Sequence, residues 1–271
     1  MEPETDCTRA PERGAETGLS HSRRSACATR LSKPGGRASR RAPERCSPAP
    51  GNLRCACFQL DSGPSRHISR FMNVEVWFEF ASTYSYPAAM RIESVALSHR
   101  VDVQWNAFLL GPVFKAQGWN DSPFNIYPTK GKYMWRDLER ICDSLSIPFR
   151  RPSAFPRNGL LAARIVTRFK SSSWIPDFVR AVYRANFADD LDISDSAVIA
   201  GCLLQIGLDA SEILGRANSA ESKSLLRSQN NMAAQLNIFG APSFVANGEL
   251  FWGNDRMEQA FEWLVRPGKV S

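Results

Sequence analysis

A serine stands where a short apolar run gives way to a helical pattern. Residues 74–80 are rich in β-branched and aromatic side chains and are too few for a buried helix, so they predict a buried strand. Ser82 follows, and a helical pattern opens at Ala88 and runs to about His99. Such a turn places a hydroxyl beside the free N–H groups of a first helical turn, where an anion, including a thiolate, is stabilised. The alternative is that Ser82 only caps the helix.

Other reactive side chains are few. The three histidines are His21, His67 and His99, which does not favour a Ser-His-Asp or Cys-His arrangement. Cys142 and Cys202 both stand in helical contexts, where a buried apolar role is usual. No His, Cys or carboxylate cluster has metal-site spacing, and there is no glycine-rich phosphate loop. We therefore expect no metal site.

A second anchor lies at residues 239–257, which must be brought to the serine by the fold. Pro242 heads a predicted strand, a position where proline is tolerated, and Asn247-Gly248 predicts a tight hairpin to a second strand. The chain then enters a last helix through Asn254 and Asp255. Strand, helix and strand at one end, with hairpin and helix at the other, form a thioredoxin-like α/β order.

The segment between these anchors is mostly helical in pattern. Residues 101–109 predict a second strand, 110–129 a long loop, and 133–145 a helix. Further helices are predicted at residues 159–169, 174–188, 195–206, 210–217 and 220–236. Their aromatic residues are mostly core, although Phe155, Trp174 and Phe178 are candidates for lining an apolar substrate pocket.

The first 71 residues differ from the rest in composition. They hold thirteen basic and seven acidic residues, so they carry +6 of the formal +7 and leave +1 for the remaining 200. The basic character therefore belongs to this arm, and we expect no nucleic-acid surface on the folded part. Because the arm has no apolar period, it cannot bury enough surface to offset the entropy of ordering, and we predict disorder.

Three interpretations of this arm compete. An organelle transit peptide is disfavoured by acidic residues near the start and by the lack of an amphipathic helix. A basic interaction tail is the second. The third, which we favour, is that translation starts at Met72 and that the arm is a gene-model artefact. With neither a signal peptide nor an apolar run of membrane-spanning length, we expect a cytoplasmic protein without membrane contact.

Three short motifs carry a resemblance to a known family. They are Ser82–Tyr86 after the first strand, Gly240–Ser243 before the hairpin, and Trp252–Arg256 (Trp-Gly-Asn-Asp-Arg) at the last helix. Together they resemble the glutathione-dependent 2-hydroxychromene-2-carboxylate isomerases and the kappa-class glutathione transferases, a branch of the DsbA-like thioredoxin group. The resemblance covers residues 72–265. Thr83 stands where the best-known members have proline, a change that we expect to affect turn rigidity more than chemistry.

The resemblance implies a thioredoxin-like domain, residues 72–110 and 237–266, interrupted by a helical insertion over about 130–236. Ser82 would donate a hydrogen bond to the thiolate of glutathione, because the family's Cys-x-x-Cys position here holds Ser82–Ser85. A cis Pro242 would turn the backbone of Ala241 towards the cofactor. The remaining binding roles that the resemblance implies fall to Lys130 for the glycine carboxylate and to Asn254 and Asp255 for the γ-glutamyl end.

Three functions remain open at this point. The first is a glutathione-dependent isomerase that acts by reversible thiolate addition to an aromatic or unsaturated keto acid, with a role in aromatic-compound catabolism. The second is a kappa-like transferase that consumes glutathione with electrophiles. The third is a non-catalytic thioredoxin-like adaptor, which would need none of Lys130, Pro242 and Asp255. The Trp-Gly-Asn-Asp-Arg motif favours the isomerase, and the resemblance alone implies a homodimer.

Overall fold

The sheet grows outward from the first strand. The computed structural model describes residues 72–266, so the arm and its predicted disorder lie outside the described residues. β1 (Asn73–Phe78) pairs in parallel with β2 (Asp102–Ala107) and antiparallel with β3 (Ser243–Ala246), which pairs with β4 (Glu249–Trp252). The strand order is β2-β1-β3-β4, which places β1 and β3 in the centre. The predicted strands, the hairpin and the thioredoxin-like order are confirmed.

Helices cover this sheet. α1 (Ser85–His99) joins β1 to β2, and α10 (Met257–Val265) packs against α1 and β3. α5 (Leu160–Arg168) packs against β2 and against α9 (Ala220–Gln235). The other helices of the insertion are α6 (Ile175–Phe187), α7 (Ser196–Gln205) and α8 (Ala210–Ala217). Their predicted positions are confirmed to within two residues at each end.

Local capping explains why several of these helices begin where the sequence predicts. The side chains of Asp195, Asp209 and Ser219 accept hydrogen bonds from backbone N–H groups in the first turns of α7, α8 and α9. Gly207 has a φ of 79°, a left-handed conformation that glycine adopts without strain, and it separates α7 from α8. The stop and restart predicted there is confirmed.

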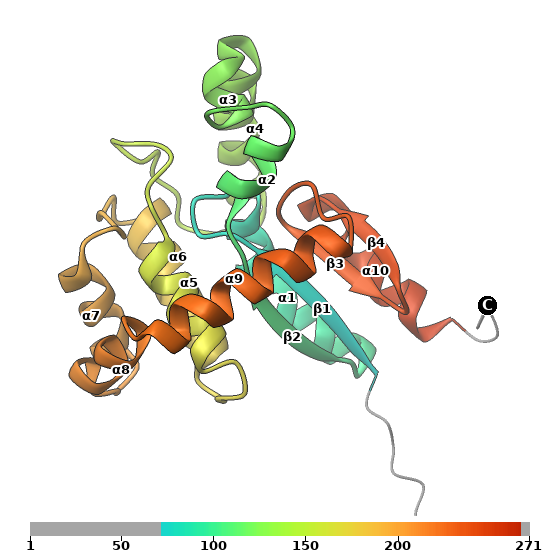
Figure 1. Cartoon of the computed structure of the whole chain (residues 1–271). Coiled ribbons are helices and arrows are strands. Elements are labelled where there is room, and N and C mark those ends of the chain that lie inside the picture. Colours follow the sequence, from blue (N-terminus) through green and yellow to red (C-terminus); the bar gives the residue numbers. More distant parts are fainter. Residues whose placement is uncertain (1–71, 267–271) are drawn as a thin grey trace, which may run out of the picture. The chain divides into compact units, whose positions relative to one another are not determined.

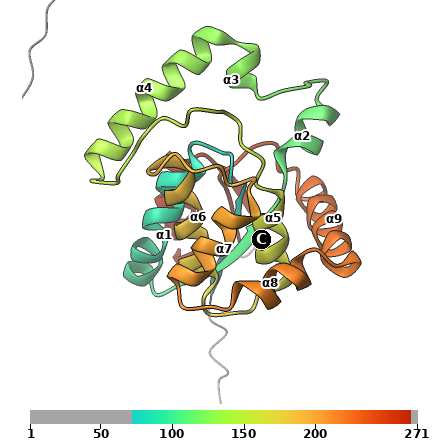
Figure 2. The same cartoon turned by 90° about the vertical axis from the view of Figure 1, so that its left-hand side faces the viewer.

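One predicted element is wrong. The segment 110–129, expected to be a loop, contains α2 (Leu110–Ala116), α3 (Pro123–Ile126) and the first residues of α4 (Pro128–Ser144). Figures 1 and 2 show these helices as an arch beyond the end of the sheet at which β1 and β2 finish. No residue of α2 or α3 is fully buried, and only half-buried residues such as Val113 and Phe124 pack on the core, so each short helix leaves a weak apolar pattern in the sequence.

The turn after β1 is fixed by the helical insertion. The Tyr183 hydroxyl of α6 donates to the Glu79 carbonyl at 3.0 Å, and the Asn186 amide donates to the Phe80 carbonyl at 3.0 Å. Phe80 is buried between Phe78, with ring centres 5.4 Å apart, and Tyr183, at 5.3 Å. These contacts hold the start of the Ser82 segment against the core.

Candidate functional site

A cavity of about 1020 Å³ lies between the sheet and the arch. On one side is what we call the sheet wall, residues 79–84 with 239–241 and Trp252; on the other is the arch, residues 110–134. A short segment, residues 155–158, completes the lining. Because β1 and β2 are parallel, the cavity lies outside the carboxyl ends of two strands, where open α/β sheets bind ligands.

Ser82 is on the sheet wall. Its side chain is mostly buried, its N–H donates to the Glu79 carbonyl at 2.9 Å, and its hydroxyl donates to the carbonyl of Ala241 at 2.9 Å. The Ser85 hydroxyl donates to Ser82 Oγ at 3.0 Å. α1 begins at Ser85 with Tyr84 as capping residue and no side-chain cap, so the idea that Ser82 only caps the helix is wrong. Instead, the Ser82 hydroxyl links the two segments of the sheet wall through its hydrogen bond to the Ala241 carbonyl.

The backbone at Ala241 faces the same cavity. The Ala241–Pro242 peptide bond is cis, as predicted, and Gly253 N–H donates to the Pro242 carbonyl at 2.9 Å. Within residues 72–266, the N–H of Ala241 makes no hydrogen bond. A strand-like ligand backbone can pair with such a free group, as in β-strand addition. Ala241 lines the cavity, whereas Pro242 lies behind it, at the base of the hairpin.

Lys130 lies on the arch and lines the cavity, but it is not the loop residue that the sequence predicts. It stands in the first turn of α4, with Nζ 5.9 Å from the centre of the Phe124 ring. Its side chain is exposed, and Lys115 of α2 also lines the cavity. The arch therefore contributes two cations towards an anionic ligand.

Asn254 and Asp255 are not among the residues that line the cavity. Asn254 is buried, and its side chain and carbonyl accept hydrogen bonds from Arg91 of α1 at 3.3 and 2.8 Å. The Asp255 side chain is 74% exposed and folds back over Gly253, where an added Cβ would lie 2.5 Å from its Oδ1. Asn254 thus ties the turn to α1, while the Asp255 carboxylate is presented next to the Pro242 end of the hairpin.

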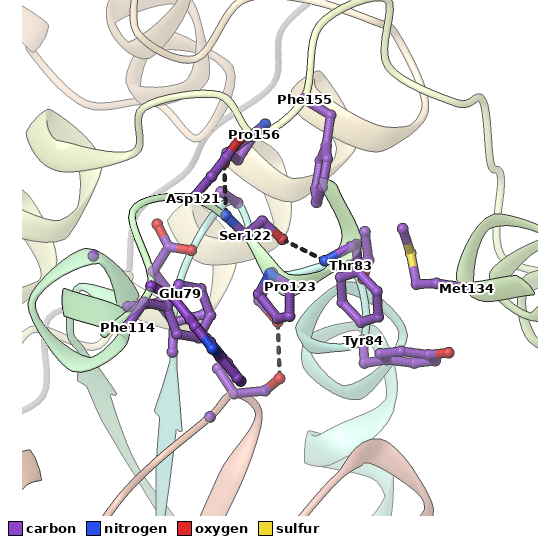
Figure 3. A pocket seen from close by; sticks show the side chains of 18 of the residues that line it. Glu79, Thr83, Tyr84, Phe114, Asp121, Ser122, Pro123, Met134, Phe155 and Pro156 are labelled. Atoms are coloured by element: carbon purple, nitrogen blue, oxygen red, sulfur yellow. Dashed lines mark hydrogen bonds between the residues drawn. The ribbon is translucent and has the colours of Figure 1, made fainter. Parts of the chain in front are cut away.

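Several lining residues escaped the sequence interpretation. Glu79 lines the cavity although it reads as the end of the buried strand, and a carboxylate in so apolar a run was the available signal. Thr83 is 1% exposed, and its Oγ1 has no hydrogen-bond partner. Threonine in place of the proline of the best-known family members therefore changes the polarity of the site as well as the turn. Figure 3 shows the Glu79 side chain close to Phe114 of the arch and apart from Thr83 and Tyr84.

The aromatic candidates divide in two. Phe155 lines the cavity, where its ring lies edge-on to Trp135 with centres 4.9 Å apart. Phe178 is fully buried in the core, and Trp174 packs on it with centres 6.1 Å apart, so neither lines the cavity. The prediction that most aromatic residues of the insertion are core also fits Phe187, which is fully buried.

Arg157 closes the cavity from the third side. It is buried, forms an ion pair with Asp190, and donates to the carbonyl of Leu191 at 2.9 Å. The hydrogen bonds from the Ser153 backbone N–H and from Arg157 lower the pKa of Asp190 to about 2. Arg157 therefore anchors the segment that carries Phe155, and its charge is already neutralised.

The two cysteines of the described part are both buried and unpaired. Burial raises the pKa of Cys142 to about 12 and that of Cys202 to about 11. Such thiols are poor nucleophiles, so disulfide exchange does not fit this chain's own described thiols. Between Met72 and Arg266, no group of three or more His, Cys, Asp or Glu side chains is arranged for a metal, and no helix is long and apolar enough to cross a membrane.

Comparison with known proteins agrees with this architecture. The family model of the DSBA-like thioredoxin domain matches residues 73–264. A 2-hydroxychromene-2-carboxylate isomerase from Sphingobium xenophagum is 27% identical over 194 residues, covering 71% of this chain and 97% of the relative. Glutathione S-transferase kappa 2 from Caenorhabditis elegans is 26% identical over 220 residues, covering 76% of this chain and 95% of the relative.

Solved structures show the same fold. A 2-hydroxychromene-2-carboxylate isomerase superposes with a TM-score of 0.60 at 24% identity, covering 69% of this chain and 92% of that one. A probable DsbA oxidoreductase from Streptomyces coelicolor gives a TM-score of 0.59 at 22% identity, covering 74% of this chain and 94% of that one. The chain described here belongs to the family of DSBA-like thioredoxin domains.

Proposed function

We propose that this protein is a glutathione-dependent isomerase of an unsaturated keto acid, of the 2-hydroxychromene-2-carboxylate isomerase type. One observation carries the proposal: the Ser82 hydroxyl and the unpaired Ala241 N–H lie on one wall of a large cavity, beside the first turn of α1. The relatives named as isomerases and kappa transferases support a glutathione-related enzyme.

The donor set fits glutathione. The Ala241 N–H offers backbone pairing, Lys130 offers a cation to a carboxylate, and Asp255 offers a negative partner to an ammonium group. Asn254 holds the turn that presents Asp255 through its bonds to Arg91. When bound, glutathione supplies a thiol that adds reversibly to a conjugated double bond, so that rotation becomes free.

The chain's own residues prepare this chemistry. Ser82 now donates to the Ala241 carbonyl, and rotation of its hydroxyl redirects the same hydrogen to a thiolate. The N–H groups of the first turn of α1 add the positive end of the helix dipole. The arch places Phe114, Trp119 and Phe124 opposite, which gives an aromatic substrate an apolar surface away from water.

Calorimetric titration of glutathione into the full chain tests the cofactor, with Ser82→Ala and Asp255→Ala beside the wild type. We expect saturable binding that Asp255→Ala weakens. Turnover of 2-hydroxychromene-2-carboxylate, followed by absorbance, then tests the reaction. Glutathione should stay at its starting concentration, since an isomerase recycles it; steady loss of free thiol would instead establish a kappa-type transferase. No binding at millimolar glutathione would overturn the proposal.

A further inference from the structure

The cavity contains a carboxyl group to which the proposed function assigns no role. Glu79 directly follows β1 and lines the cavity, three residues before Ser82. A single tight turn joins the two, since Ser82 N–H donates to the Glu79 carbonyl at 2.9 Å. In Figure 3 the Glu79 side chain lies inside the cavity, on the side of Phe114. Both polar side chains therefore face the space in which a ligand would bind.

The Glu79 carboxyl group takes part in no side-chain interaction that holds the described fold together. Among residues 72–266 it forms no ion pair, and the one donor that acts on it is the backbone N–H of Ala81. Glu75, within β1, is different: its carboxylate accepts from Trp77 Nε1 at 3.1 Å and from the Asn106 amide at 3.4 Å. Glu75 is a structural glutamate, whereas the fold leaves Glu79 available.

Desolvation without a neighbouring cation favours the neutral form of Glu79. The pKa of Glu79 is raised to about 8, because burial disfavours the charged form and the Ala81 N–H offsets only part of that effect. The Tyr183 hydroxyl of α6 donates to the backbone carbonyl of Glu79, and burial and the nearby Glu79 charge raise the pKa of Tyr183. The other titratable and charged groups that line the cavity are Tyr84, Lys115, Asp121, Lys130, Tyr133 and Arg157. Glu79 is therefore a carboxylic acid near neutral pH, suited to giving and retaking a proton.

We propose that Glu79 is the catalytic acid and base of the isomerisation, donating a proton to the substrate and taking it back. This inference rests on the proposed function. Bound glutathione would supply a thiolate, and a sulfur electron pair would form the C–S bond. The electron pair of the substrate's double bond would move towards its carbonyl and would take the proton of Glu79 as the O–H bond of Glu79 breaks. After rotation the same proton would return to the Glu79 carboxylate as the double bond re-forms and the C–S bond breaks. The carboxylic acid, the thiolate and the electron count would end as they began, so no oxidant is required.

The test compares Glu79→Gln with the wild type in three measurements. Glutathione affinity by calorimetry should be unchanged, which shows that the fold and the cofactor site persist. Turnover of 2-hydroxychromene-2-carboxylate should fall about 100-fold or more, the usual contribution of a positioned acid or base. The alkaline fall in wild-type turnover, centred near the pKa of about 8, should be absent from the residual activity of the variant. Glu79→Asp, which keeps a carboxyl group, should recover part of the turnover.

Glu75→Gln is the matched control, since it makes the same change within β1 and outside the cavity, and its turnover should equal that of the wild type. If glutathione does not bind the wild type, the proposed function fails and the role of Glu79 fails with it. If the wild type binds glutathione and turns the keto acid over while Glu79→Gln is equally fast, only the role of Glu79 is overturned. Bound glutathione without any turnover overturns both the reaction and the acid.

Discussion

The sheet wall and the arch enclose one cavity but are built in opposite ways. On the sheet wall, Ala81, Ser82 and Thr83 are buried, and their turn is fixed by hydrogen bonds from Tyr183 and Asn186. In the arch, no residue of α2 or α3 is buried. Groups that must be aligned for chemistry thus stand on the rigid wall, and groups that meet a substrate stand on the less anchored one. The difference predicts where substitutions change stability and where they change specificity.

The largest contrast is expected from one change made on each side. Phe80→Ala removes a ring packed against Phe78 and Tyr183 in the core beneath the sheet wall, and should lower the free energy of unfolding by about 3–5 kcal/mol. Phe114→Ala in the arch removes a half-buried ring that packs at a tilt against Trp119, and should lower the free energy of unfolding by about 1 kcal/mol at most. Urea denaturation measures both, and equal losses would contradict the comparison.

A smaller effect tests whether the arch has a rigid point of its own. Gly131 of α4 is buried, and a Cβ there would lie 2.1 Å from the Phe124 carbonyl oxygen, so Gly131→Ala must push α3 away and should destabilise by about 1–3 kcal/mol. Gly111 of α2 has nothing within 4 Å, and Gly111→Ala should be neutral or slightly stabilising. Thermal melts should therefore show a lower melting temperature for Gly131→Ala and an unchanged or slightly higher one for Gly111→Ala; a Gly131→Ala variant that melts like the wild type would show that α3 moves aside at little cost.

The dependence of stability on pH gives the next effect. The folded state raises the pKa of Glu79 from 4.5 to about 8, so across that window the folded chain binds more protons than the unfolded one. Stability due to this residue is therefore full below the lower value and is lost as the pH rises through the higher one. Relative to Glu79→Gln, the free energy of unfolding of the wild type should fall by about 1–3 kcal/mol between pH values of about 5 and 9. Denaturation at each pH measures it. A constant difference between the two proteins would show that Glu79 is not shielded from water.

The smallest effect concerns Thr83. Its buried Oγ1 has no partner, so Thr83→Val removes an unsatisfied hydroxyl at nearly constant shape and should change the free energy of unfolding by about −0.5 to +1 kcal/mol, with stabilisation the expected sign. Ser82→Val is the control, because it removes a hydroxyl that bonds to Ala241 and should be destabilising. A clear loss of stability in Thr83→Val would mean that its hydroxyl has a partner after all.

The fold was predictable where the elements pack against the hydrophobic core, because their sequences then show apolar periodicity. Residues 74–80 predict β1, and Asp195 and Asp209 mark helix starts, because burial and capping leave local signals. The helices of the arch were missed because they bury little surface and therefore leave few such signals. A helix such as α3, Pro123–Ile126, has no fully buried residue and only its capping Ser122 and the proline in its first turn as signals, so its pattern resembles that of a loop.

The site was predictable in part. Ser82 and Ala241 could be named because each stands close to an element that is clear in the sequence. The structure brings Ser82 Oγ to 2.9 Å from the Ala241 carbonyl oxygen. Glu79 could not be assigned, since a glutamate at a strand end is equally consistent with a solvated edge; only tertiary packing shows that the half-buried Glu79 lines the cavity. Asp255 depends on a ligand, so neither the sequence nor the fold alone decides its role.

The hydrogen bond between Ser82 and Ala241 joins residues 159 positions apart. β3 begins just after the far end of that bond, is also the central partner of β1, and is made almost last. During synthesis on the ribosome, β1 must therefore wait with one edge unpaired until the hairpin emerges, a stage at which exposed strand edges favour aggregation. A chain that stopped short of residue 241 would hold most of the helices but would lack the Ala241 part of the cavity wall.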